Sequence, residues 1–328
     1  MKLTVLGAGA WGTALAASWA SQHVVTLWGR NARDVDTMRA CRVNTHYLPG
    51  CPLPSSLALS ADFDRALDAA ELAVIAVPSS GLRATLAALA RRPALPPVLW
   101  VCKGFEPGSR RLPHQLVAEL LPADAETGVL SGPSFAQEVA HGYPTALTLA
   151  SANIALAQRL AETLSGNRLR LYAHDDVVGV EIGGALKNVM AIAAGICDGL
   201  NFGHNARAAL ITRGLAEMTR LGVEFGGRFE TFMGLSGLGD LILTTTGDLS
   251  RNRQVGLRVA TGQPLDRILD ELGHVAEGVT TAREVAAIAT ERGVDMPITR
   301  MVCRILFEGL PASEAVDSLL NREIRSEF

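Results

Sequence analysis

A lysine in an apolar setting is the clearest candidate for acid–base chemistry in this chain. Lys187 lies in the segment EIGGALKNVMAIAAG (Glu181–Gly195), where most neighbours are small or apolar and packing does not explain a charge. Desolvation favours the neutral amine, which suits a general acid or base. The alternative is a lysine whose ammonium group reaches water past its apolar stem. Asp240 follows a glycine-rich stretch, and its carboxylate is suited to pair with Lys187 and hold it in place.

Polar residues also follow segments that read as buried strands. Lys103 follows Val98–Val101, and Gly132 and Ser134 follow Val129–Leu130. In doubly wound sheets ligands bind beyond the carboxyl ends of the strands, so these residues are candidates for a ligand crevice. Lys103 in such a crevice can orient a carbonyl or a phosphate, and a plain surface lysine is the equally weighted alternative.

A third candidate is the segment Ser250-Arg251-Asn252-Arg253, which precedes a helical run. Ser250 is suited to cap that helix. A helix start that also carries Arg251 and Asn252 is a good site for a substrate phosphate, because backbone amides and a guanidinium both bind anions. The alternative is an ordinary capped helix on the surface.

The motif GAGAWG (Gly7–Gly12) lies between a strand expected at Leu3–Leu6 and a helix expected at Thr13–Ser21. That context is the one that a dinucleotide-binding fingerprint needs. The first glycine allows the tight turn, the second lets the backbone approach a pyrophosphate, and the third lets the helix pack closely on the sheet. A tight turn without a ligand is the alternative. The residues expected to contact the cofactor here are Gly7, Gly9, Ala10, Trp11 and Gly12.

The end of the next strand, Val24–Trp28, indicates which dinucleotide binds. An acidic residue there would bind the ribose hydroxyls of NAD. The chain instead has Gly29-Arg30, with Arg33 close behind, and a guanidinium can pair with the 2′-phosphate of NADP. We therefore expect NADPH to be favoured over NADH, with two solvated arginines as the alternative.

The first half of the chain alternates apolar strand-like runs with alanine-rich helical runs, which predicts a parallel sheet covered on both faces. The expected strands are Leu3–Leu6, Val24–Trp28, Leu72–Val77, Val98–Val101, Val129–Leu130 and Ala146–Leu149. The expected helices include Thr13–Ser21, Leu82–Ala90 and Ala155–Leu164. Residues Cys41–Ser60, rich in Pro and Ser, are expected to form a surface loop.

Strand-like runs nearly vanish in the second half. The helices expected there are Glu181–Asp198, Ala206–Leu221, Asp266–Leu272, Thr281–Arg292 and Ser313–Asn321. A chain of 328 residues exceeds what one core usually supports, so two domains are expected. We predict an α/β fold, with a Rossmann-type, doubly wound and mostly parallel sheet in a dinucleotide-binding domain (residues 1–180). An all-helical substrate and catalytic domain (residues 181–328) follows.

Composition limits the partners. The chain is 48% hydrophobic with a formal net charge of -3 and shows no long basic run, so nucleic acid and an anionic membrane surface are not expected partners. A small anionic ligand needs only a few local cations. The five cysteines form no CxxC pair and do not cluster with the histidines, so we expect no metal site and free thiols in a reducing compartment.

Two apolar runs bear on location. The N-terminal run to Ala20 resembles a signal peptide, but glycines interrupt it at a functional spacing. The stretch Ile182–Ile196 is expected to be too short to cross a bilayer, and it contains Lys187. We therefore expect a cytoplasmic protein without membrane insertion, and the sequence leaves open whether it forms a homodimer.

Eight segments together resemble the bacterial NAD(P)-dependent glycerol-3-phosphate dehydrogenases, and they span essentially the whole chain. They are GAGAWG (Gly7–Gly12), AVPS (Ala76–Ser79), CKGFE (Cys102–Glu106), SGPSFAQE (Ser131–Glu138), GGALKNVMAIAAG (Gly183–Gly195), NARAALITRGLAEM (Asn205–Met218), GLGDLILT (Gly237–Thr244) and SRNR (Ser250–Arg253). The resemblance implies a Rossmann-type domain joined to a helical one. It also implies an oxidoreductase that interconverts dihydroxyacetone phosphate and sn-glycerol 3-phosphate with NAD(P)H and supplies the glycerophospholipid backbone.

The same resemblance implies roles for the candidate residues, with Lys187 as the proton donor or acceptor at the substrate oxygen and Lys103 and Asp240 completing the polar site. The substrate-binding residues would be Lys103, Gly132, Ser134, Lys187, Asp240, Ser250, Arg251 and Asn252. Beyond the glycine turn, Arg30 and Arg33, the cofactor would contact Lys103, Ala136, Arg251, Val275 and Glu277. Asn188 and Thr244 would lie next to the main site. The chain departs from the family at Ala10, where a hydroxyl residue is common, so a side-chain contact to phosphate is not expected there.

Two other functions remain open at this point. A 3-hydroxyacid or 6-phosphogluconate-type dehydrogenase shares the layout and a helix lysine, but it would bind a carboxylate where this chain has Ser250–Arg253. A non-catalytic NADPH-binding regulator would not need Lys103, Lys187 and Asp240 together.

Overall fold

The computed structural model describes residues 1–166, 168–272 and 276–315. By its internal contacts the chain divides into two compact units, Met1–Glu181 and Ile182–Phe328.

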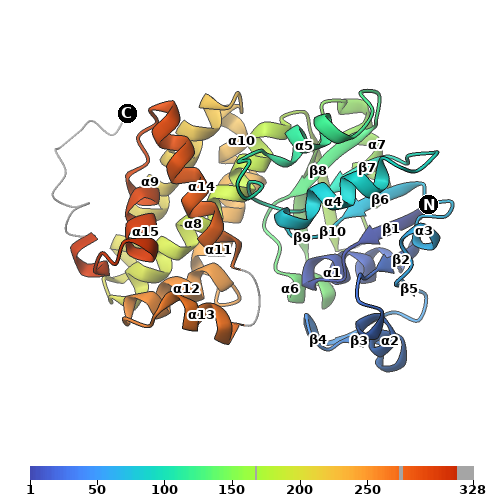
Figure 1. Cartoon of the computed structure of the whole chain (residues 1–328), viewed down its shortest axis with the longest axis horizontal. Coiled ribbons are helices and arrows are strands. Elements are labelled where there is room, and N and C mark those ends of the chain that lie inside the picture. The colour runs from blue at the N-terminus through green and yellow to red at the C-terminus, as the bar shows by residue number, and fades with distance from the viewer. Residues whose placement is uncertain (167, 273–275, 316–328) are drawn as a thin grey trace. The chain divides into compact units, whose positions relative to one another are not determined.

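The first unit is built on an eight-stranded sheet (Figure 1). Its strands are β1 (Lys2–Leu6), β2 (Val24–Trp28), β5 (Ala58–Ser60), β6 (Leu72–Ile75), β7 (Val98–Trp100), β8 (Thr127–Ser131), β9 (Thr145–Ala150) and β10 (Leu169–His174). Their order is β10-β9-β8-β7-β6-β1-β2-β5, and all neighbours are parallel except β8 and β9, which are antiparallel. The sheet runs outward in both directions from β1 and β6, so the topological switch point lies between these two strands.

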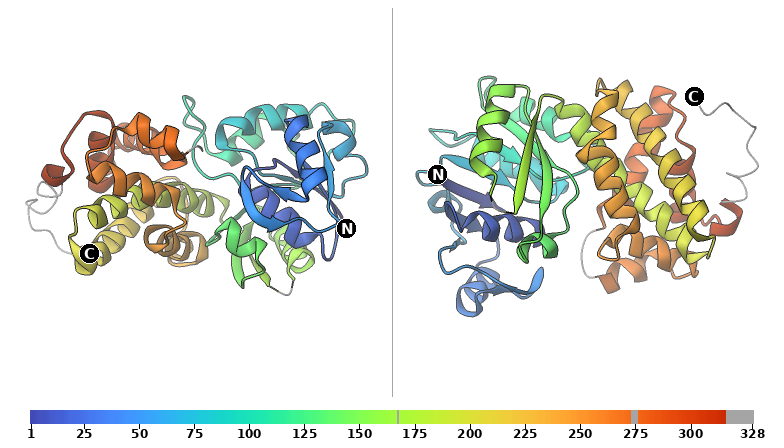
Figure 2. Two further views of the ribbon diagram at one scale, coloured as in Figure 1. Left: turned by 90° about the horizontal axis from the view of Figure 1, so that it is seen from below. Right: turned by 180° about the vertical axis from the view of Figure 1, so that it is seen from behind.

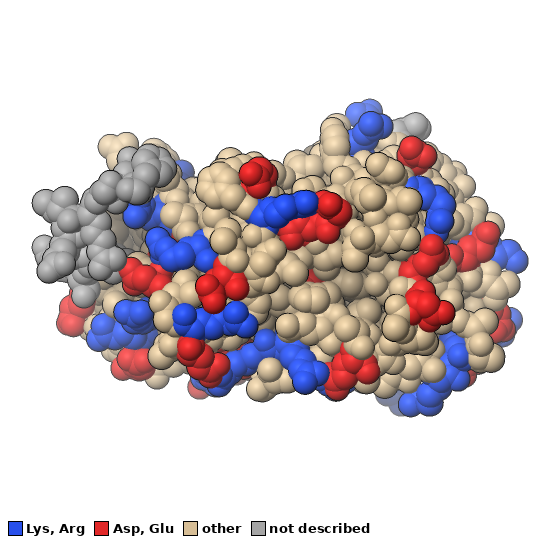
Figure 3. Space-filling view, turned by 90° about the horizontal axis from the view of Figure 1, so that it is seen from above, with Lys and Arg blue, Asp and Glu red and all other residues tan. Residues whose placement is uncertain are grey.

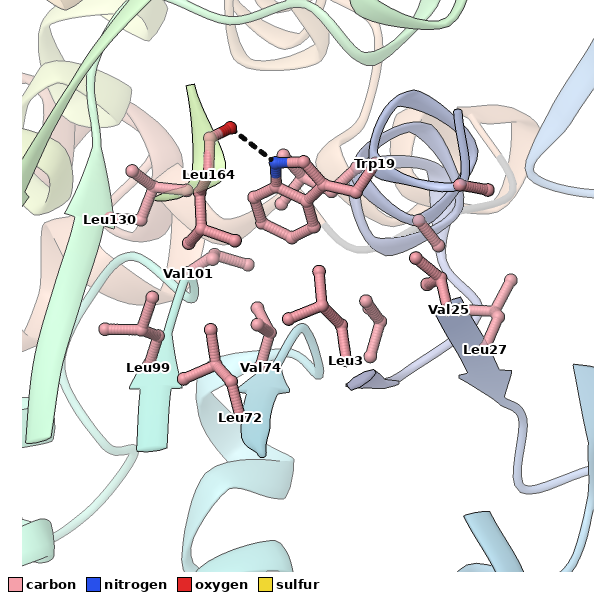
Figure 4. Packing of buried hydrophobic residues seen from close by; sticks show 14 of the residues in the cluster. Leu3, Trp19, Val25, Leu27, Leu72, Val74, Leu99, Val101, Leu130 and Leu164 are labelled. Atoms are coloured by element: carbon pink, nitrogen blue, oxygen red, sulfur yellow. Dashed lines mark hydrogen bonds between the residues drawn. The ribbon is translucent and has the colours of Figure 1, made fainter. Parts of the chain in front are cut away.

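Helices cover both faces of the sheet because the strands are apolar on both faces. They are α1 (Ala10–Trp19), α2 (Ala32–Cys41), α3 (Phe63–Ala66), α4 (Ser79–Leu89), α5 (Pro113–Leu120), α6 (Ala136–Ala140) and α7 (Ile154–Leu164). Alternate residues of one strand enter different cores: Val74 packs with α1 and α7, whereas Ile75 packs with α4 and α5. Figure 4 shows the first of these cores, in which the indole of Trp19 donates a hydrogen bond to the carbonyl of Leu164 at 3.1 Å. The expected doubly wound, mostly parallel sheet is confirmed.

Two details of the first unit differ from the sequence-based expectation. Strand β10 was not predicted, because its alternation of buried and exposed residues is short. The expected surface loop at Cys41–Ser60 is wrong. It contains an antiparallel hairpin of β3 (Val43–Asn44) and β4 (Leu48–Pro52), and then the edge strand β5. Leu48 and Cys51 are buried in a small core with residues of α1 and α6. The prolines of this segment favoured a loop in the sequence analysis, although its apolar residues are buried.

The second unit consists of helices in the part of the chain that the structure describes (Figures 1 and 2). They are the later part of α8 (Val177–Gly199), α9 (Gly203–Glu224), α10 (Phe229–Met233), a π-helix (Leu235–Gly239), α11 (Asp240–Thr246), α12 (Arg251–Ala260), α13 (Leu265–Leu272), α14 (Glu277–Arg292) and α15 (Pro297–Phe307). The all-helical expectation is confirmed, and α10, α11 and α15 are helices that were not predicted. The expected helix Ser313–Asn321 lies beyond the described residues from residue 316 onward.

The expectation that the apolar stretch Ile182–Ile196 is too short to cross a bilayer is wrong. The apolar stretch belongs to a helix of 23 residues, which is long and apolar enough to span a membrane. In the structure 89% of its apolar window is buried inside the protein, as in the core helix of a globular fold.

The described surface mixes charges of both signs: Figure 3 shows basic and acidic side chains interspersed on one face.

Glu217 of α9 is buried against the start of α15. Its carboxylate accepts hydrogen bonds from the amides of Ile298 at 2.6 Å and Thr299 at 3.2 Å, and from the Thr299 hydroxyl. These amides belong to the first turn of a helix, where no intrahelical partner exists. Burial outweighs the hydrogen bonds and raises the pKa of Glu217 to about 7.

This raised pKa predicts a pH-dependent stability. The carboxyl binds its proton more tightly in the folded state, so the free energy of unfolding should fall as the pH rises from about 4.5 to about 7. The contribution of this one group is about 3 kcal/mol. Urea unfolding of wild type and Glu217→Gln across this range measures it. We expect the variant to show a flatter pH dependence, and equal slopes in the two proteins would contradict the assignment.

Candidate active site

The glycine turn of the first unit has the geometry that its sequence predicts. Gly7 has a φ of 127°, and a Cβ there would lie 2.6 Å from the carbonyl oxygen of Ala76. A Cβ on Gly12 would lie 2.1 Å from the carbonyl oxygen of Gly7, so α1 packs closely only without a side chain at this position. At Gly9, a Cβ would have no atom within 4 Å, so the described structure leaves this side of the turn open to a ligand. The residues present therefore fit a pyrophosphate held by the start of α1.

The two arginines after β2 are both exposed. Arg30 follows Gly29, and Arg33 lies in the first turn of α2, which Asn31 caps by accepting a hydrogen bond from the Arg33 amide at 3.0 Å. Their guanidinium groups are thus available to solvent beside the end of β2. This arrangement agrees with a site for an anionic group and does not by itself select NADPH.

The residues after β7 and β8 come together at one edge of the sheet. Because β6, β7 and β8 are parallel neighbours, their carboxyl ends lie side by side. Lys103 Nζ donates to the carbonyl oxygen of Gly132 at 3.2 Å, and the Ser134 hydroxyl donates to the same oxygen at 3.0 Å. Ala136 follows as the first residue of α6. The sequence-based grouping of Lys103, Gly132 and Ser134 is therefore a spatial cluster.

The second unit places Lys187 in a buried polar cluster. Lys187 Nζ donates to Asp240 Oδ1 at 2.5 Å and to the Thr244 hydroxyl at 3.0 Å. The Asp240 side chain is fully buried and that of Lys187 is 10% exposed. The Thr244 hydroxyl in turn donates to the backbone carbonyl of Asp240 at 2.6 Å. The ammonium group is thus held by partners inside the protein, and the alternative of a lysine reaching into water does not apply.

Glycines bring the two halves of this cluster together. Gly183 and Lys187 are four residues apart, on one face of α8. A Cβ on Gly183 would lie 2.4 Å from the carbonyl oxygen of Ser236, so the backbone of α8 touches the π-helix that leads into Asp240. Short π-helical segments often occur at functional sites. Close backbone contact is therefore the local reason that Asp240 reaches Lys187.

The segment Ser250–Arg253 divides its side chains between the interior and the surface. Ser250 caps α12, as expected, by accepting a hydrogen bond from the Arg253 amide. Arg253 turns inward, where its guanidinium pairs with Asp198 of α8 at 2.7 Å and with Asp248 at 2.9 Å. Arg251, in contrast, is exposed at the first position of the helix. Arg251 is thus the residue of this segment whose exposed guanidinium can bind an anion. Arg253 instead stabilises the helix start through its ion pairs.

Backbone contacts also fix α12 against α8. A Cβ on Gly195 of α8 would lie 2.1 Å from the carbonyl oxygen of Arg253, and one on Gly256 of α12 would lie 2.1 Å from that of Ile192. Two helices that meet at glycines on both sides have little freedom to slide. The helix that carries Lys187 and the helix start that carries Arg251 are therefore held at a fixed spacing.

The remaining candidates lie around this helix start. Asn252 Oδ1 accepts a hydrogen bond at 3.1 Å from the amide of Gly278, in the first turn of α14. Glu277, the first residue of α14, is half-buried, and the carbonyl of Asn188 packs against Gly278. Val275 lies outside the described residues.

The start of α8 is held by a further buried polar group that sequence reasoning did not single out. Glu181 accepts hydrogen bonds from the indole of Trp100 at 2.8 Å and from the amide of His114 at 2.9 Å, and its carboxylate contacts the His114 ring. Burial raises the pKa of Glu181. Burial alone would lower the pKa of His114, but the hydrogen bond and charge of Glu181 outweigh it, so the net shift is upward. An acidic residue at the start of an apolar helix was the sequence signal for Glu181. Its partners Trp100 and His114 could not be predicted, because they lie in distant segments.

A doubly wound sheet with an open glycine turn at its switch point, together with a buried lysine paired with an aspartate on a helical unit, is the arrangement of a dehydrogenase that uses a nicotinamide dinucleotide. Two family models match the chain: the NAD-dependent glycerol-3-phosphate dehydrogenase N-terminus over residues 2–157, and the C-terminus of the same family over residues 176–317. The chain belongs to the NAD-dependent glycerol-3-phosphate dehydrogenase family.

Individual relatives agree with this family. The chain is 95% identical to glycerol-3-phosphate dehydrogenase (NAD(P)+) of Thiobacillus denitrificans over the full length of both proteins. It is 58% identical to the enzyme of the same name from Nitrosospira multiformis, again over both full lengths. The crystal structure of glycerol-3-phosphate dehydrogenase from Coxiella burnetii has a TM-score of 0.93 at 44% identity and covers 98% of this chain and 99% of its own. D-mandelate dehydrogenase, solved with NADH, shares only the fold, at 14% identity and a TM-score of 0.61.

Proposed function

We propose that the protein reduces dihydroxyacetone phosphate to sn-glycerol 3-phosphate, with Lys187 as the proton donor and NADPH as the favoured cofactor. The observation that carries this proposal is the buried Lys187–Asp240 pair. The helix that carries Lys187 packs against α12, whose N-terminus, with Arg251, is suited to bind a phosphate. We further propose a cytoplasmic role in supplying the glycerophospholipid backbone. Cys41, Cys51, Cys197 and Cys303 are unoxidised thiols, which supports a reducing compartment.

We assign the two units different tasks. The first, Met1–Glu181, would be the dinucleotide-binding domain, holding the cofactor at Gly7–Gly12 and at the arginines after β2. The second, from Ile182 onward, would be the substrate and catalytic domain. When bound, the dinucleotide supplies a hydride to the ketone carbon, and all proton handling then falls to this chain's side chains.

The chain's own residues account for the rest of the reaction. Arg251 and the amides at the start of α12 would bind the substrate phosphate and align the ketone. Lys187 would give its proton to the oxygen that becomes an alkoxide, because Asp240 keeps the ammonium form charged in a buried place. Thr244 would fix the direction of the ammonium group. Lys103 would add positive charge that stabilises the developing oxyanion.

The central test is turnover after removal of the lysine. Loss of NADPH absorbance is followed with dihydroxyacetone phosphate, with a 2-keto acid, and with no substrate. We expect wild type to consume NADPH only with dihydroxyacetone phosphate, and Lys187→Ala to bind NADPH normally while kcat falls roughly 10²–10⁴-fold, the usual contribution of a positioned acid–base group.

Arg267→Ala is the matched control, since it removes an exposed cation of the same unit whose side chain is 72% exposed. It should leave kcat unchanged. Near-normal turnover by Lys187→Ala would contradict its role. Turnover of the keto acid instead would favour a 3-hydroxyacid-type dehydrogenase, and NADPH binding without any turnover would favour a regulator.

Cofactor preference is tested separately by fluorescence titration of NADPH and NADH. We expect wild type to bind NADPH more tightly, and Arg30→Ala to lose roughly 10- to 100-fold in NADPH affinity with little change for NADH, because a charge-assisted hydrogen bond contributes roughly 1.5–3 kcal/mol. Equal affinities for the two cofactors in wild type, unchanged in Arg30→Ala, would refute the preference. Replacement of the more remote Arg39, which pairs with Asp36, serves as a control.

A further inference from the structure

Asn44 is a buried residue of the β3–β4 hairpin that none of the roles above uses. The residue is 4% exposed, and both Nδ2 and Oδ1 of its side chain are hydrogen-bonded. Nδ2 donates to the carbonyl oxygen of Ala8 at 2.9 Å and to the Thr13 hydroxyl at 2.8 Å. Oδ1 accepts from the amide of Tyr47 at 3.1 Å, which closes the hairpin turn. Asn44 thus ties the hairpin to both ends of the glycine turn.

The bond to Ala8 has a consequence for the next residue. The Ala8 carbonyl and the Gly9 amide belong to one planar trans peptide unit, so the N–H of Gly9 points opposite to the C=O of Ala8. Holding the carbonyl oxygen against Asn44 therefore fixes the direction of the Gly9 N–H. Donation to the carbonyl also polarises the peptide and strengthens its N–H as a donor. Since no atom lies within 4 Å of a Cβ built on Gly9, the space beside this residue is open.

The hairpin is packed so that Asn44 keeps this position. Asn44 pairs with Leu48 across the hairpin, and Leu48 is buried in a small core with Ala14 of α1 and Val139 of α6. Figure 1 shows β3 and β4 beside these two helices. The core anchors the hairpin to α1, and Asn44 is the polar contact that extends from it to the turn.

We propose that Asn44 is a positioning residue for the pyrophosphate of the dinucleotide, acting through the Ala8–Gly9 peptide. This inference rests on the proposed dinucleotide site. It assigns a polar, turn-orienting function to a segment that reads in sequence as a surface loop. It also separates two uses of the hairpin: Leu48 stabilises the unit, whereas Asn44 orients a ligand-binding amide.

The test compares a ligand that has the pyrophosphate with one that lacks it. The Kd of NADPH is measured by fluorescence titration, and adenosine 2′-phosphate, which has no pyrophosphate, is measured as a competitor of NADPH. For Asn44→Ala we expect NADPH affinity to fall about tenfold, the order of one lost hydrogen bond, with adenosine 2′-phosphate affinity unchanged. Turnover at saturating NADPH should stay within about twofold of wild type, because the proton donor is untouched.

Two further variants separate orientation from stability. Asn44→Asp keeps the acceptor for Tyr47 but cannot donate to Ala8, so it should weaken NADPH at least as much as Asn44→Ala does. Leu48→Ala removes buried packing but leaves the three side-chain hydrogen bonds of Asn44, so it should lower the Tm and weaken NADPH clearly less than Asn44→Ala does.

Three results would overturn the role of Asn44 while wild type still binds NADPH. They are unchanged NADPH affinity in Asn44→Ala, equal loss of NADPH and adenosine 2′-phosphate, and an equal loss of NADPH affinity in Leu48→Ala. Failure of wild type to bind NADPH would instead overturn the proposed dinucleotide site, and this inference with it.

Discussion

The ion pair between Lys187 and Asp240 is the interaction on which the rest of the second unit depends. A buried ammonium and a buried carboxylate are each costly alone, and their pairing offsets that cost only with good geometry and further hydrogen bonds. Thr244 accepts one such bond from the Lys187 ammonium, and its hydroxyl is oriented by donating to the backbone carbonyl of Asp240. In the proposed mechanism the same pair holds the ammonium group of the proton donor in an apolar place, where a lone lysine would favour its neutral form. The stability of the fold and the proposed chemistry therefore both require that Lys187 and Asp240 stay paired.

Such geometry needs rigid backbone, and glycines provide it. Gly183 lets α8 touch the π-helix before Asp240, and the contact of Gly195 with Gly256 sets α8 against α12. In each case a Cβ in place of the glycine hydrogen would clash with a backbone carbonyl, so the two helices would have to move apart. The first unit uses the same device at Gly12, where α1 packs on the turn itself. In both units, side chains that could do chemistry stand on helices whose spacing is set by backbone contact.

Features with a local signal could be predicted from the sequence. The glycine turn, the Ser250 cap and the charge of Lys187 among apolar residues each identify themselves by type and spacing, and the structure shows the predicted Lys187–Asp240 contact. Contacts between distant segments could not be predicted. Asn44 meets partners that lie 31 and 36 residues earlier, and no periodic pattern connects them. The partners of the buried acids Glu181 and Glu217 likewise could not be predicted, because they come from other elements.

The most direct test of the central claim is the pH dependence of kcat in Asp240→Asn. Without the carboxylate the buried Lys187 should favour its neutral form, so kcat should fall by at least about 10²-fold at neutral pH. Activity should then partly return as the pH is lowered and the lysine regains its proton, while the Kd of NADPH stays at the wild-type value. A folded variant with wild-type kcat at neutral pH, or one whose loss does not depend on pH, would contradict the account.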